Sequence, residues 1–322
     1  MTTSQIQPSR FSSLPRRIAV AVVAIPIILW LALTGGYLFF LFVALLSGLA
    51  LHEFYALTEA KGAYPLKTFG LVAGFFVNMA FIYERLQVDT FAFFQTRGFH
   101  LSLFSQPQFF SVTIIVITLT VILSELFRTR GSPLQNAGAT LLGILVIPVG
   151  FGTLVLTREL FPYGFPVAKF FANAIPGEVE LGQIDRWGGG TVVALLAAIW
   201  VCDTAAYFAG LTLGRHKLFA RVSPGKTWEG TVAGFLGSVL TFWLARRAGL
   251  SYLSTTEALT LGTLVGVFGQ LGDLVESRFK RDAGVKDSSA IIPGHGGVYD
   301  RFDSLVFVAP IVYLYIDFVV LS

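Results

Sequence analysis

Long apolar runs constrain the fold of this chain more than any other feature. An apolar helix of about 20 residues can cross a bilayer, because a helix satisfies all its backbone hydrogen bonds internally. We therefore predict an all-α, polytopic integral membrane protein with about nine transmembrane helices. The nine runs lie roughly at residues 18–34, 37–57, 67–84, 108–126, 136–157, 190–212, 229–246, 255–276 and 303–321. We expect residues 85–107 to form a longer connection between the third and fourth runs.

The composition supports this class. Hydrophobic residues make up 54% of the chain and charged residues only 13%, whereas soluble domains carry about 25% charge. The isoelectric point near 9.2 is modest for a nucleic-acid-binding protein, so we expect a lipid bilayer and no nucleic acid as partner. The one cysteine, Cys202, excludes a disulfide within the chain, and we expect it to be a small buried side chain.

The loop charges indicate an orientation. Arg16 and Arg17 precede the first run as in a signal peptide, but that run is long and lacks a small-residue cleavage site. We expect a retained first helix and a cytoplasmic N-terminus, because most Lys and Arg residues then fall in cytoplasmic segments. The expected location is the inner (cytoplasmic) cell membrane. We divide the chain into residues 1–189, with helices one to five, and residues 190–322, with four catalytic helices and cytoplasmic motif loops.

Two acidic positions stand out within the apolar runs. His52 and Glu53 lie near the end of the second run, where we expect a helix end that reaches the membrane interface. Asp203 is the only formal charge between Arg186 and Arg215. A carboxylate inside a spanning helix costs about 2.5–3.5 kcal/mol, so Asp203 should face a polar cavity, a cation or an ion-pair partner.

The stretch "RVSPGKTWEGTVAG", residues 221–234, ends like a phosphate-binding P-loop. Ala220 stands where that loop needs glycine, and we expect no strand before the stretch, so we reject the P-loop fold. Ser223, Lys226 and Thr227 still offer hydroxyls and a cation at the start of a helix, where backbone N–H groups favour phosphate. The alternative is a helix cap beside a lysine that extends to solvent. Gly230 and Gly234 form a helix-packing pair.

The eighth run combines small residues with acids. Gly262, Gly266, Gly269 and Gly272 allow another helix to approach closely. Asp273 and Glu276 are three residues apart and share a helix face, and Lys280 and Arg281 follow at the helix exit. Buried carboxylates with cations at the mouth of the helix are typical of metal ligands beneath a phosphate site.

The stretch "KDSSAIIPGHGGVYDRFDSL", residues 286–305, is strongly polar and directly precedes the last run. Asp300 and Asp303 are three residues apart at the start of the predicted ninth helix, with Arg301 between them. Two neighbouring acids repel each other unless a cation neutralises them, and an all-oxygen site suits Mg²⁺. His295, flanked by glycines, could donate to a phosphate or carry a proton.

These residues resemble a known family. The segment "SRFKRDAGVKDSSAIIPGHGGVYDRFD", residues 277–303, is similar to the signature of phosphatidate cytidylyltransferases, also called CDP-diacylglycerol synthases. The stretches "CDTAAYFAG", "SPGKTWEG" and "GDLVES" are also similar to blocks of that family. The resemblance rests on specific motifs over residues 202–304. Over residues 1–190 it consists only of a general pattern of apolar helices.

The resemblance implies a reaction between CTP and phosphatidic acid that gives CDP-diacylglycerol and pyrophosphate. It implies Mg²⁺, with a second cation such as K⁺, and a homodimer by analogy. A CTP-dependent polyprenol or lipid kinase and a cation-coupled transporter remain the alternatives. We expect catalytic roles for Asp203, Lys226, Lys280, Arg281, Lys286, Asp287, His295 and Arg301, substrate binding by Ser223, Lys226, Thr227, Lys280, Arg281, Gly296 and Gly297, and metal binding by Asp273, Glu276, Asp300 and Asp303.

Overall fold

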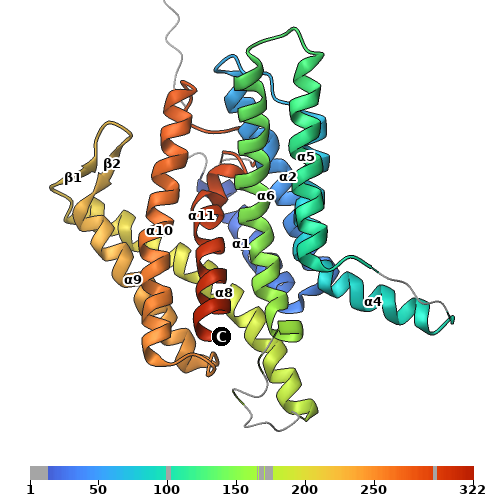
Figure 1. Ribbon diagram of the computed structural model, residues 1–322. Helices are drawn as coiled ribbons and strands as arrows, with labels where there is room; N and C mark the ends of the chain where they lie inside the picture. Colours follow the sequence, from blue (N-terminus) through green and yellow to red (C-terminus); the bar gives the residue numbers. More distant parts are fainter. Residues whose placement is uncertain (1–13, 99–102, 165, 167–169, 171–176, 293–295) are drawn as a thin grey trace, which may run out of the picture.

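The computed structural model describes residues 14–98, 103–164, 166, 170, 177–292 and 296–322. In this part of the chain, helices form a bundle with one small hairpin at its side (Figure 1). The helices are α1 (Leu14–Thr34), α2 (Gly36–Glu59), α3 (Lys67–Phe81), α4 (Tyr83–Gln95), α5 (Gln106–Leu126), α6 (Pro133–Gly164), α8 (Glu178–Thr212), α9 (Trp228–Ala248), α10 (Thr255–Asp282) and α11 (Tyr299–Tyr315), which continues as the π-helix η2 (Ile316–Val320).

The all-α membrane architecture is confirmed. Six described helices are long and apolar enough to cross a membrane: α2, α5, α6, α8, α10, and α11 together with η2. The helices α3 and α4, bent by 72° at their junction, would make a seventh span if they count as one. Eight of the nine predicted runs each coincide with one helix (the last with α11 and η2), whereas the run at residues 67–84 covers α3 and the start of α4. The total of nine spans and the cytoplasmic N-terminus stay predictions.

Two elements differ from expectation. Residues 85–107, which we expected to form a connection, contribute most of helix α4. The expectation of no strand before the stretch 221–234 is wrong, because β1 (Lys217–Phe219) precedes it, and β2 (Ser223–Thr227) within it leads directly into α9. This strand pairs antiparallel with β1 (Lys217–Phe219) in a two-stranded sheet, where an edge position tolerates Pro224. It is not the parallel sheet of a P-loop protein.

Glycines let α10 pack closely between α9 and α11, as the sequence predicted. A Cβ atom on Gly262 would lie 2.5 Å from the Cα atom of Val239 in α9. On the side facing α11, a Cβ atom on Gly272 would lie 3.0 Å from the backbone oxygen of Asp303. The absence of side chains at these positions therefore brings the acidic part of α10 against the start of α11.

A charged pair in α6 fixes the turn between α1 and α2. Arg158, only 2% exposed, donates to the Ala32 carbonyl at the end of α1 and to Asp185, both at 2.9 Å. Its neighbour Glu159 accepts the backbone N–H of Gly36 at 2.8 Å. Helix ends leave backbone groups without intrahelical partners, and these two side chains satisfy some of them for both helices. The turn lies at the opposite end of the bundle from the α10–α11 connection (Figure 1).

Candidate active site

Three carboxylates from two helices form the centre of the candidate site. Asp273 and Glu276 lie on α10 and Asp303 on α11, and one oxygen of each lies within 4.8 Å of the others. Glu276 is 1% exposed, and its Oε1 atom has no hydrogen-bond partner among the described residues. A buried carboxylate oxygen without a donor fits a cation ligand. Three of the four predicted metal ligands are thus close together.

Asp300, the fourth predicted ligand, lies outside that group of three. Its Oδ1 atom accepts from Lys280 Nζ at 2.9 Å, and its Oδ2 atom accepts from the backbone N–H groups of Gly297 at 2.8 Å and Ser288 at 3.0 Å. These donors come from both ends of the connection between α10 and α11. Asp300 therefore holds the described residues 283–292 and 296–298 between α10 and α11, which we call the motif loop, and its role as a metal ligand stays a prediction.

Two lysines balance the acidic charge. Lys226 Nζ lies 2.6 Å from Asp273 Oδ2, and both side chains are partly exposed, at 22% and 34%. Lys280 Nζ lies 2.6 Å from Glu276 Oε2, and the Lys280 side chain is only 12% exposed. Opposite charges at this range stabilise the ionised carboxylates. Lys280 lines the larger of the two cavities described below, and Lys226 lines the smaller.

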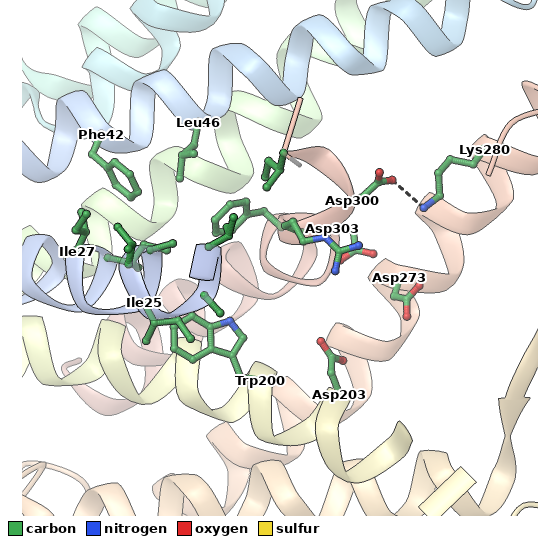
Figure 2. Close-up of a pocket in the computed structure, with 18 residues that line it drawn as sticks. Ile25, Ile27, Phe42, Leu46, Trp200, Asp203, Asp273, Lys280, Asp300 and Asp303 are labelled. Carbon is green, nitrogen blue, oxygen red and sulfur yellow. Dashed lines mark hydrogen bonds and ion pairs between the residues drawn. The ribbon is translucent and has the colours of Figure 1, made fainter. Parts of the chain in front are cut away.

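Two cavities meet at the carboxylates. The larger, of about 1010 Å³, has an apolar wall from α1, α2 and α8 and a polar end that includes Asp203, Asp273 and Asp303. Figure 2 shows the apolar side chains Ile25 and Phe42 at one end and these acids at the other. The smaller cavity, of about 430 Å³, is also lined by Asp203 and Asp273. The shared acids make this the point where contents of the two cavities could react.

The smaller cavity includes the predicted "SPGKT" residues. Ser223, Lys226 and Thr227 line it, and all three belong to β2. Thr227 is the N-cap of α9, and its hydroxyl accepts the backbone N–H of Gly230 at 3.2 Å. A helix N-terminus favours negative charge, so the Thr227 cap and the Lys226 cation are compatible with an anion in this cavity.

The other predicted residues are distributed more widely. Arg301 lines the larger cavity. Arg281 is exposed and donates to the Val285 carbonyl at 3.2 Å, and Lys286 and Asp287 are exposed in the loop that follows. His295 lies outside the described residues. The glycines after it are close to the site: Gly296 has a φ of +83°, and Gly297 donates to Asp300.

The sequence matches a known family along most of its length. The profile described as "Cytidylyltransferase family" aligns with residues 15–319. The chain belongs to this family. The expected resemblance is thereby confirmed, and the matched residues include the carboxylates, the lysines and β2 described above.

Several bacterial members of the family are similar to this chain. A protein of Synechocystis sp. named phosphatidate cytidylyltransferase is 33% identical over 310 residues, covering 94% of this chain and 96% of that protein. A protein of the same name from Staphylococcus epidermidis is 30% identical over 295 residues, or 92% and 96% of the two chains. The Bacillus subtilis protein of that name is 41% identical over 138 residues, which cover 42% of this chain and 50% of that protein.

Sequence reasoning missed one residue that contacts the loop beside this candidate site. Glu53 of α2, for which we expected only a helix end at the interface, is 1% exposed and contacts the motif loop. Ser288 donates its hydroxyl to Glu53 at 2.9 Å across 235 positions of sequence. The only signal was a lone acid in an apolar run, which does not identify its partner.

Proposed function

We propose that this protein transfers the cytidylyl group of CTP to phosphatidic acid, giving CDP-diacylglycerol and pyrophosphate. The observation that carries the proposal is the pair of cavities that share Asp203 and Asp273. One cavity is largely apolar and the other is lined by a lysine and hydroxyls. A reaction between a lipid phosphate and a water-soluble nucleotide needs both environments at one point.

The larger cavity suits the lipid substrate. Val23, Ile27 and Leu46 are among the apolar side chains that line it. Each CH₂ group kept in an apolar environment contributes about 0.8 kcal/mol, so the acyl chains should remain against this wall during the reaction. The lipid phosphate would then lie at the polar end, near Arg301 and Asp303.

The smaller cavity suits the triphosphate of CTP. Lys226 supplies a cation, and the first turn of α9, capped by Thr227, supplies the positive end of a helix dipole. Its volume of about 430 Å³ is in the range of small-molecule sites. The Lys226 ammonium would exchange its Asp273 partner for a phosphate oxygen as CTP binds.

The site residues fit a divalent cation. Asp273, Glu276 and Asp303 supply closely spaced oxygens of the type that Mg²⁺ prefers, and Asp300 is next to them. We propose that this group holds Mg²⁺, with a second cation such as K⁺ nearby. When bound, the cation would screen phosphate charge and make the phosphorus more electrophilic.

The chemistry needs little proton transfer. An oxygen of the phosphatidate phosphate attacks the α-phosphorus of CTP, a new P–O bond forms, and the bond to the bridging oxygen of pyrophosphate breaks. The second pKa of a phosphate monoester is about 6, so this nucleophile is already an anion near neutral pH. The main barrier is repulsion between two polyanions. Lys226, Lys280 and Arg301 reduce it, because their charges lie around the shared end of the cavities.

The cellular setting is part of the proposal. We propose that the site opens to the cytoplasm, where CTP is available, and that the protein resides in the inner membrane as a possible homodimer by family analogy only. The α2–α3, α5–α6 and α10–α11 connections lie at one end of the bundle, which is consistent with one face bearing the predicted basic loops (Figure 1).

Product analysis tests the reaction. Purified protein in detergent is incubated with CTP, phosphatidate and Mg²⁺, and CDP-diacylglycerol and pyrophosphate are quantified. We expect equal amounts of both products. Diacylglycerol in place of phosphatidate is the control, because it lacks the nucleophilic phosphate. Absence of CDP-diacylglycerol with phosphatidate, or phosphorylation of the diacylglycerol, would contradict the proposal.

A further inference from the structure

Glu53 of α2 is the buried carboxylate on which the motif loop between α10 and α11 converges. It accepts four hydrogen bonds from that segment. The hydroxyl groups of Ser288 and Ser289 donate at 2.9 and 2.6 Å, and the backbone N–H groups of Val298 and Tyr299 donate at 3.0 and 2.8 Å. A buried carboxylate is costly unless donors surround it, and here each of its oxygens accepts two bonds.

Two of these bonds cap helix α11. The first N–H groups of a helix have no intrahelical acceptor, and they are usually satisfied by the side chain at the N-cap position. That position in α11 is Val298, whose side chain has no polar atom. Glu53 supplies the missing acceptor from a different helix. The negative charge also suits the positive end of the α11 dipole.

The remaining contacts connect Glu53 to the acidic site. Ser288 donates its hydroxyl to Glu53 and its backbone N–H to Asp300. Gly297 lies against the same carboxylate, since a Cβ atom there would be 2.4 Å from Glu53 Oε2. The path from α2 to the site therefore runs through Ser288 to Asp300 and then to Lys280.

We propose that Glu53 is a positioning residue of the site: it fixes the motif loop and the first turn of α11, and so places Asp300 and Asp303 opposite the carboxylates of α10. Glu53 is not among the residues that line either cavity, so it is not a catalytic residue. The effect of Glu53 on turnover rests on the proposed function. Its effect on the loop is independent of that function.

A positioning role and a purely structural role predict different results. A structural role predicts loss of stability with unchanged kinetics in the protein that remains folded. A positioning role predicts a fall in kcat, because a displacement on the ångström scale costs about a hundredfold in rate. KM for CTP should change little, since the ammonium of Lys226 bonds to Asp273 and to the Gln270 carbonyl of α10 and not to the motif loop.

The decisive variant is Glu53→Gln, which keeps the side-chain length but replaces one acceptor oxygen by a donor. Amide hydrogen exchange of residues 296–303 should become faster by about ten- to a hundredfold, the equivalent of one lost hydrogen bond to a charged group. We expect kcat to fall about a hundredfold. The matched control is Glu59→Gln on the same helix, because Glu59 is exposed and pairs with Lys67.

A second variant keeps the test decisive if Glu53→Gln does not fold. The double variant Ser288→Ala, Ser289→Ala removes two donors from the loop and leaves the helix cap intact. It should raise exchange over residues 286–292 and lower kcat, by less than Glu53→Gln does. Wild-type exchange and wild-type kcat in either folded variant would overturn the inference. A wild-type protein that makes no CDP-diacylglycerol would instead contradict the proposed function, and the exchange data would still decide whether Glu53 holds the loop.

Discussion

Replacing Lys280 by Met removes the cation from a buried group of charges while keeping most of the side-chain volume. Lys280 Nζ lies 2.6 Å from Glu276 Oε2 and 2.9 Å from Asp300 Oδ1. The three side chains are 12%, 1% and 2% exposed, so water cannot replace the lost ammonium readily. Removing one partner of a buried ion pair costs about 3–5 kcal/mol, because it leaves an uncompensated charge.

The same substitution at Lys226 should cost much less. The pair between Lys226 and Asp273 is partly exposed, and exposed pairs contribute about 0–1 kcal/mol. We therefore expect Lys280→Met to lower the apparent melting temperature by several degrees and Lys226→Met to change it little. Lys217→Met, on the exposed strand β1, is the control for the substitution itself.

A double variant tests whether the unpaired Glu276 carboxylate causes the loss of stability. Asp300 keeps its two backbone donors without Lys280, whereas Glu276 loses the only cation paired with it in the described part of the chain. Adding Glu276→Gln to Lys280→Met should therefore recover part of the lost stability. Melting is followed by intrinsic fluorescence, for which the chain has five tryptophans. Equal melting temperatures for the two lysine variants, or no recovery in the double variant, would refute the reasoning.

Other predictions concern the acids, the CTP site and the topology. Asp303→Asn and Asp300→Asn should each lower kcat by orders of magnitude at saturating Mg²⁺, while both proteins still purify. A near-normal rate in either variant would remove the substituted residue from the site. Lys226→Ala should lower kcat/KM for CTP about ten- to a hundredfold, and Lys226→Arg should recover only part of it; unchanged kinetics would assign Lys226 to the helix cap. With Cys202 replaced, a cysteine at Ser288 should resist an impermeant reagent applied outside intact cells, and labelling there would reverse the predicted topology.

Local sequence spacing was enough to predict much of this site. Asp273 and Glu276 are three residues apart on one helix, so helix geometry alone puts them on one face. The glycines at 262 and 272 predicted close packing, and the structure shows α10 in close contact with α9 and α11 through them. Asp303 then joins the acids of α10 because these helices approach so closely.

Contacts between distant segments were not predictable in this way. Glu53 and Ser288 are 235 positions apart, and one acid near a helix end looks the same whether it faces the interface or a loop. The separate roles of Asp300 and Asp303 depend on how the motif loop folds back over α11, which spacing does not specify. The hairpin was missed because Pro224 and Gly225 indicate a turn, yet an edge strand also tolerates them. The division of the chain at residues 189 and 190 stays a prediction.

The fate of each CTP phosphorus tests the central claim most directly. Purified protein is given phosphatidate, Mg²⁺ and CTP labelled either at the α-phosphorus or at the γ-phosphorus. Cytidylyl transfer predicts that the α label enters the lipid fraction and the γ label leaves as pyrophosphate, with both lost in Asp303→Asn. A lipid fraction that carries the γ label, and no α label, would contradict the account and identify a kinase instead.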